Sequence, residues 1–141
     1  MKYDDASWHY EGDFPADLPE EAGATHIGMF LAWAALSHLA SDDFYSDMSE
    51  EFKQLQQREI TPGRLLLVCC DGKLIDEDLS DEGNAFACVY LNIHAGDYTT
   101  DYASVLTRSL PTIYHAPDTW SSFDKLKPTL DKRFAEWKAA R

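Results

Sequence analysis

Residues 19–40 read PEEAGATHIGMFLAWAALSHLA, and this stretch decides the fold class. Pro19 followed by Glu20 and Glu21 suits the first turn of a helix, where proline is tolerated and carboxylates face the positive end of the helix dipole. From residue 27 to residue 36 the stretch is apolar on nearly every side. A surface helix keeps one polar face, so this pattern is typical of a buried helix. The sequence therefore predicts a central helix over 19–40.

Several other segments carry apolar residues at helical spacing, with capping residues at their ends. They are residues 46–59, residues 61–72, residues 76–96 with Phe86, Val89, Tyr90 and Ile93 on one face, a short segment over 98–106, and a last helix that Asp118 or Ser121 caps and that includes Trp137. Pro128 falls inside the last helix, which requires either a kink or a later start. The pattern predicts five or six helices.

The segment RLLLVCC, residues 64–70, fits two structures. A short apolar run of this kind is found in buried strands as well as in helices. Thr61 followed by Pro62 is typical of a helix start, and Asp71 followed by Gly72 is typical of a helix end. These flanking residues favour a helix, and a buried strand stays the alternative.

The chain has 141 residues, of which 45% are hydrophobic, enough for one core and too few for two. No repeat or linker divides it. Residues 1–18 show no sustained period and are interrupted by Gly12 and Pro15. We therefore predict one all-α domain over residues 1–141, with an irregular N-terminal arm over 1–18 that its aromatic residues hold against the body.

The charge is strongly acidic and unevenly distributed. The formal net charge is −13, with 25 acids against 12 bases and a pI near 4.5. Residues 1–51 hold twelve acids and the single base Lys2, whereas residues 125–141 hold six bases and two acids. Such a field repels nucleic acid and anionic membrane surfaces and attracts basic proteins. The charge excludes the first two as expected partners.

The cysteines and the apolar runs indicate a cytoplasmic protein. Cys69, Cys70 and Cys88 are odd in number and contain no Cys-x-x-Cys pair, which is typical of free thiols in a reducing compartment. The first ten residues lack the apolar segment of a signal peptide. The longest apolar run has ten residues, about half of a membrane span.

Short catalytic motifs are absent. The sequence contains no phosphate-binding loop, no dinucleotide-binding glycine pattern, no His-Glu-x-x-His and no Gly-x-Ser-x-Gly. The five histidines are His9, His26, His38, His94 and His115, and none lies four residues from another. The sequence therefore predicts no catalytic residue, no bound metal and no cofactor.

One rival hypothesis assigns chemistry to the histidines. His9 lies close to Asp4 and Asp5 in the chain, and imidazole with carboxylate suits divalent metal ions. A small enzyme or metal-binding protein would use His9 and His26 with nearby carboxylates. A concave pocket joining His9, Asp5 and His26 would favour this hypothesis, whereas a flat acidic face would favour a binding protein.

Four segments together resemble one family. They are KYDDASWHY at the start, EAGATHIGMFLAWA, DEGNAFA and the tail YHAPDTWSSFDKLKPTLDKRFAEWKA. They are similar to small, uncharacterised bacterial cytosolic proteins that have a K-Y-D-D-A-x-W-H start and an A-T-H-I-G-M-F-L-A-W helix. The size and acidity of that family resemble those of immunity proteins, which neutralise toxins delivered between bacteria.

The favoured hypothesis is therefore a non-enzymatic protein that binds and neutralises a basic bacterial toxin. An acidic surface steers a cationic partner towards itself, and aromatic side chains anchor the contact. The expected partner-binding residues are Asp4, Asp5, Trp8, His9, Tyr10, Asp42, Asp43 and Asp47. The sequence leaves the oligomeric state open.

Overall fold

The structure is a computed structural model that describes residues 1–92 and 95–141. The elements in chain order are β1 (Lys2–Asp5), α1 (Ala6–Tyr10), η1 (Glu20–Ala24), α2 (Thr25–Leu36), α3 (Asp42–Asp47), α4 (Ser49–Gln56), α5 (Pro62–Cys70), β2 (Lys73–Ile75), η2 (Asp76–Asp78), α6 (Asp81–Tyr90), α7 (Tyr98–Leu106), η3 (Ile113–His115) and α8 (Trp120–Ala139), where η marks a short 3-10 helix. The prediction of a single, mostly helical domain is confirmed.

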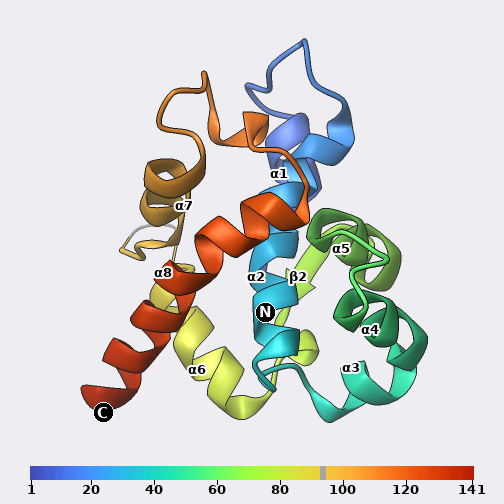
Figure 1. Cartoon of the computed structure of the whole chain (residues 1–141), viewed down its shortest axis with the longest axis vertical. Helices are drawn as coiled ribbons and strands as arrows, with labels where there is room; N and C mark the ends of the chain where they lie inside the picture. The colour runs from blue at the N-terminus through green and yellow to red at the C-terminus, as the bar shows by residue number, and fades with distance from the viewer. Residues whose placement is uncertain (93–94) are drawn as a thin grey trace.

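Helix α2 runs through the centre of the molecule, with α5 on one side and α8 on the other (Figure 1). Every residue of α2 from Thr25 to Ala35 is buried. The ring of Trp33 lies 5.6 Å from the rings of Phe30, Phe86 and Phe134, measured between centroids. The predicted helix over 19–40 is too long at both ends, because a 3-10 turn precedes α2 and His38 adopts a left-handed φ of 63° just beyond it.

The segment that fitted two structures is the helix α5. The side chain of Thr61 accepts a hydrogen bond from the backbone N–H of Arg64, and Pro62 occupies the first turn. Asp71 ends the helix in the left-handed conformation, with φ 53°. The helix predicted from the flanking residues is therefore confirmed, and the alternative of a buried strand is wrong.

Two predicted helices differ from the structure at their ends. The segment 46–59 is divided between α3, which Ser41 caps, and α4, because the backbone at Met48 leaves the helical conformation. The segment 76–96 begins with the short η2, and α6 ends at Tyr90. The predicted face position Ile93 and His94 lie outside the described residues.

The cap of the last helix lies one residue after Asp118 and two residues before Ser121. Thr119 caps α8 by accepting a hydrogen bond from the backbone N–H of Ser122. Pro128 lies inside α8, and the helix continues through it to Ala139. None of the helices in the described parts of the chain combines the length and the apolar character needed to cross a lipid bilayer.

The N-terminal arm is more regular than predicted. Residues 2–5 form β1, which pairs antiparallel with β2 in a two-stranded sheet, and α1 follows directly. The sequence shows no period here because both strands are very short and their partners lie about seventy residues apart. Tyr3 is buried, as a side chain that holds the arm should be, whereas Trp8 is 53% exposed.

Candidate functional site

One carboxylate and two imidazole rings meet where the arm contacts the central helix. Asp4 lies on β1, His9 on α1 and His26 in the first turn of α2. The Oδ1 atom of Asp4 is 2.7 Å from Nε2 of His9, and its Oδ2 atom is 3.2 Å from Nε2 of His26. A single carboxylate therefore bridges both rings. We call these three residues the Asp4–His9–His26 cluster.

The small sheet and the first helix place His9 beside α2. Asp4 pairs with Leu74 of β2, and the backbone N–H of Ala6 donates to the carbonyl of Gly72 at 2.9 Å. The side chain of Asp5 then caps α1 by accepting from the backbone N–H of Ser7 at 2.9 Å. Because β1 is held by β2 and α1 follows β1 directly, the His9 ring lies next to the His26 ring, with 4.5 Å between their centroids.

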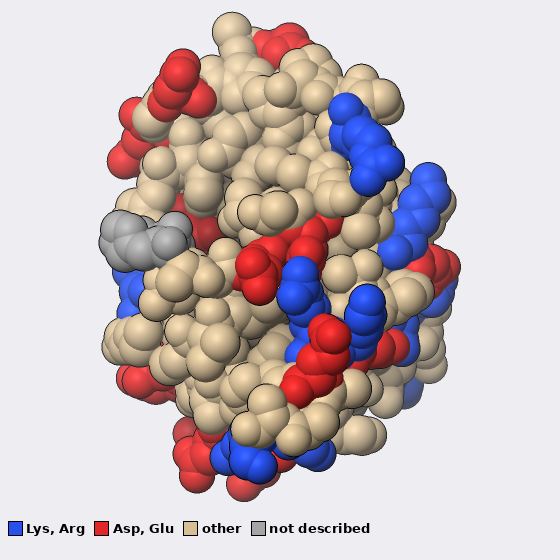
Figure 2. Space-filling model, turned by 90° about the vertical axis from the view of Figure 1, so that its left-hand side faces the viewer, with Lys and Arg blue, Asp and Glu red and all other residues tan. Residues whose placement is uncertain are grey.

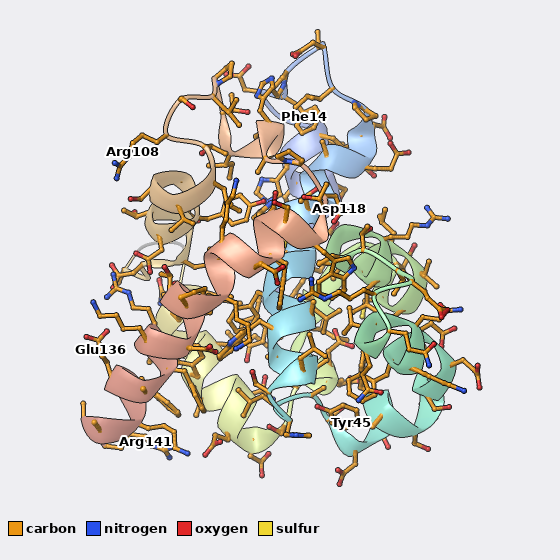
Figure 3. The ribbon with its side chains drawn as sticks, in the orientation of Figure 1. Phe14, Tyr45, Arg108, Asp118, Glu136 and Arg141 are labelled. Carbon is orange, nitrogen blue, oxygen red and sulfur yellow. The ribbon has the colours of Figure 1, made fainter. Side chains whose placement is uncertain are left out.

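A tyrosine from a distant loop completes the surroundings of His9. The hydroxyl group of Tyr114, in η3, is 2.7 Å from Nδ1 of His9. The ring of Phe14 packs against the Tyr114 ring with 4.9 Å between centroids, at the end of the molecule where Phe14 is labelled (Figure 3). Tyr114 was not predicted as a site residue, because it follows His9 by 105 positions and no motif surrounds it.

Hydrogen bonds keep the carboxylate of the cluster ionised. Burial alone would raise the pKa of Asp4, but the hydrogen bonds from His26 and His9 outweigh it and hold this pKa well below its usual value. Burial lowers the pKa of His26 despite the opposing effect of Asp4, so that ring is neutral at neutral pH. The cluster therefore joins an ionised carboxylate to a buried neutral imidazole.

The cluster is partly accessible and borders a cavity. The side chains of Asp4 and His9 are 24% and 21% exposed, whereas that of His26 is 5% exposed. Asp4 also lines a cavity of about 280 Å³, whose walls include Tyr3, Phe30 and Tyr98. A small molecule in this cavity would lie beside Asp4.

These three side chains could hold a metal ion. One potential ligand atom from each of Asp4, His9 and His26 lies within 4.8 Å of the others. Two imidazoles and one carboxylate suit divalent transition metals such as zinc, iron, manganese and cobalt. The carboxylate that joins His9 and His26 is that of Asp4 and not that of Asp5, because the side chain of Asp5 caps α1 instead.

The arm's predicted partner-binding residues differ widely in exposure. Asp5 is 5% exposed, and it also accepts a hydrogen bond from Lys2 at 2.8 Å. Tyr10 is partly buried against the core. Trp8 is exposed, with the ammonium group of Lys2 5.2 Å from its ring centroid. The two adjacent carboxylates of the arm thus make internal contacts, and Trp8 is its most accessible predicted residue.

The other predicted partner-binding residues lie far from the arm. Asp42, Asp43 and Asp47 are all exposed on α3. Helices α1 and α3 lie at opposite ends of the long axis (Figure 1). The eight predicted residues therefore do not form one continuous surface.

Three basic residues of the C-terminal helix, Lys127, Arg133 and Lys138, pair with acids. Lys127 pairs with Asp131 at 2.6 Å, and Arg133 donates to Asp101 at 2.8 Å. The face that carries α7 and α8 shows Lys and Arg interleaved with Asp and Glu (Figure 2). This face therefore presents no large patch of one sign.

Comparison with known proteins identifies a family and no relative of known activity. Residues 2–116 match a family described as a domain of unknown function (DUF7832). No curated protein and no solved structure matches the chain.

Proposed function

The chain belongs to the DUF7832 family, and we propose that it binds a divalent transition-metal ion through Asp4, His9 and His26 and uses the ion on a small molecule. The observation that supports this proposal is the meeting of three ligand side chains from three separate elements. Their contacts are specific, because one carboxylate accepts from both rings.

The protonation states of the cluster suit metal binding. A metal ion requires a deprotonated carboxylate and a neutral imidazole, and binding is weaker when protons must first be removed. Asp4 is ionised and His26 is neutral, for the reasons given by their pKa shifts. When an ion binds, the hydrogen bonds between the Asp4 carboxylate and the two imidazoles would be replaced by bonds from the same oxygen and nitrogen atoms to the ion.

Three protein ligands leave coordination positions for water or substrate, as in catalytic zinc sites. A bound ion there would supply Lewis-acid chemistry, which polarises a carbonyl group or activates a water molecule. The cavity beside Asp4 measures about 280 Å³ and has aromatic walls. Its volume is slightly below the range of about 300–1,000 Å³ that is typical of small-molecule sites. We therefore propose a small, partly apolar substrate rather than a polymer.

A metal titration tests this proposal. Zinc ions would be titrated into the protein in competition with a chelating dye, and cobalt ions would be followed by their visible absorption. We expect one ion per chain, and we expect His9→Gln to remove most of the binding. His38→Asn is the matched control, since His38 is exposed and lies beyond the end of α2, outside the cluster.

Circular dichroism would establish that each variant is folded. His9 is the decisive position because its ring is partly exposed, so its replacement perturbs the core less than replacement of the buried His26. A wild-type protein that binds zinc no better than the folded His9→Gln variant would contradict the proposal.

A second candidate function is supported by the exposed acids of α3. Asp42, Asp43 and Asp47 face solvent in a chain of net charge −13. We propose that the protein neutralises a basic toxin, and that this surface attracts the toxin and raises its association rate. The binding would involve no enzymatic step by this chain.

The genomic neighbourhood provides the test of this second candidate. A neighbouring gene for a secreted toxin would supply the partner to be purified. Its association rate should fall with added salt, and it should fall further when Asp42, Asp43 and Asp47 are all replaced by Asn. A rate insensitive to both changes would contradict a role for this surface.

A further inference from the structure

The two imidazole rings of the cluster have unequal surroundings on their far sides. Nδ1 of His9 is 2.7 Å from the hydroxyl of Tyr114. Nδ1 of His26 is buried and has no hydrogen-bond partner among the described residues. Tyr102 lies edge-on to His26, with 6.1 Å between ring centroids, yet its buried hydroxyl also lacks a partner within the described parts of the chain.

The contacts of Asp4 fix where the ring hydrogens lie in the metal-free protein. An ionised carboxylate only accepts hydrogen bonds. Nε2 of His9 and Nε2 of His26 must therefore each carry a hydrogen to donate to Asp4. In an imidazole whose single hydrogen is on Nε2, Nδ1 is an acceptor, and the Tyr114 hydroxyl donates to it.

Coordination by Nε2 of His9 requires its lone pair. The hydrogen must leave Nε2, and in a neutral ring it then resides on Nδ1. The hydrogen bond to Tyr114 reverses, so that Nδ1–H donates to the phenol oxygen. The ring keeps its charge, and the total number of protons on it is unchanged. Ligating histidines ordinarily donate their second N–H to a fixed acceptor in this manner.

We infer that Tyr114 is the positioning residue that stabilises the metal-binding tautomer of His9. This inference rests on the proposed metal site. The position of Tyr114 is fixed independently of any ion, because its backbone N–H donates to the side chain of Thr112 at 3.1 Å and Phe14 packs on its ring. The neighbouring His115 is tied to Asp17 at 3.1 Å, which holds this loop to the arm.

Two single-atom variants separate this role from a general effect on the site. Tyr114→Phe removes the hydroxyl that contacts His9 and keeps the ring. Tyr102→Phe is the matched control, because it removes a hydroxyl beside His26 that has no partner in the described structure. Zinc affinity would be measured by chelator competition, and the hydrogen positions on His9 by nitrogen-15 NMR of its ring, with and without zinc.

We expect Tyr114→Phe to weaken zinc binding about 10- to 100-fold, the usual effect of losing such a partner. Tyr102→Phe should leave the affinity within about twofold of wild type, far below that effect. In the wild type, the His9 hydrogen should lie on Nε2 without zinc and on Nδ1 with zinc.

Three results would overturn the inference: equal zinc affinities of the Tyr114→Phe variant and the wild type, equal losses in the two tyrosine variants, or a hydrogen on Nδ1 of His9 before zinc is added. Failure of the wild type to bind zinc would instead refute the proposed metal site. The metal-free NMR measurement would still report the hydrogen position on His9.

Discussion

Gly28 of α2 lies directly against the carbonyl group of Pro62 at the start of α5. A Cβ atom placed on Gly28 would come within 2.3 Å of the Pro62 oxygen and 2.7 Å of the Gly63 Cα atom. Both obstacles are backbone atoms, so neither can move aside without shifting a helix. The close approach of these two helices therefore depends on the missing side chain.

Gly28→Ala should reduce the free energy of unfolding by about 1–3 kcal/mol or more, because it forces the α2–α5 contact apart. Urea denaturation of wild type and variant would measure the loss. Gly12→Ala is the control, since the nearest atom to its added Cβ would be 3.4 Å away, an ordinary contact. An equal and small effect at both positions would show that α2 and α5 can separate freely.

Trp33→Ala should cost roughly 3–5 kcal/mol of unfolding free energy, because the side chain is fully buried among aromatic rings. The indole N–H also donates to Asp131 at 2.9 Å. Trp33→Phe would retain part of the packing and lose this hydrogen bond, so its unfolding free energy should lie between those of the wild type and Trp33→Ala. A loss below about 1 kcal/mol for Trp33→Ala in urea melts would contradict the burial of the ring.

Asp5→Ala should destabilise the protein by about 1 kcal/mol or more through loss of the α1 cap. The carboxylate accepts from the backbone and hydroxyl of Ser7 and from Lys2, and it is buried. Thermal melting would measure the change. Asp13→Ala is the exposed control. If the two variants have the same melting temperature, Asp5 does not stabilise the protein as a cap of α1.

The helices that the sequence predicted well have local signals. The Thr61–Pro62 start and the Asp71–Gly72 end of α5 lie within one short segment, and the apolar stretch of α2 is visible by itself. The pairing of β1 with β2 has no such signal, because it joins segments about seventy residues apart. Propensity within a strand of three or four residues is too weak to reveal it.

The same limit explains the candidate site. Asp4 and His9 are neighbours in the chain, so their association was foreseeable, whereas His26 joins them only after β1 and α1 have folded back. The sequence does not show which of the two adjacent carboxylates, Asp4 or Asp5, contacts the histidines. The alternation of side chains along β1 determines this, because Asp4 faces the imidazoles while Asp5 caps the following helix. Tyr114 arrives from another loop altogether.

The ion pair between Asp101 and Arg133 should make stability depend on pH. Burial alone would raise the pKa of Asp101, but hydrogen bonds from Arg133 and Tyr90 outweigh it, so the pKa lies below its ordinary value of 3.8. A lowered pKa contributes stability that is fully present above the unfolded value and is lost as pH falls through the folded value. Asp101→Asn should thus cost stability at pH 7.

The loss in Asp101→Asn should shrink as the pH falls below about 3.8, because the unfolded wild-type chain then takes up a proton that the native carboxylate takes up only at lower pH. Urea melts of both proteins at pH 7, 4 and 3 would measure it. Asp124→Asn is the matched comparison, since Asp124 also pairs with an arginine, Arg58, but both side chains are about half exposed. An exposed pair is screened by solvent, so its loss should be smaller at every pH. A cost for Asp101→Asn that stays constant from pH 7 to pH 3 would mean that the charge of Asp101 does not stabilise the contact between α7 and α8.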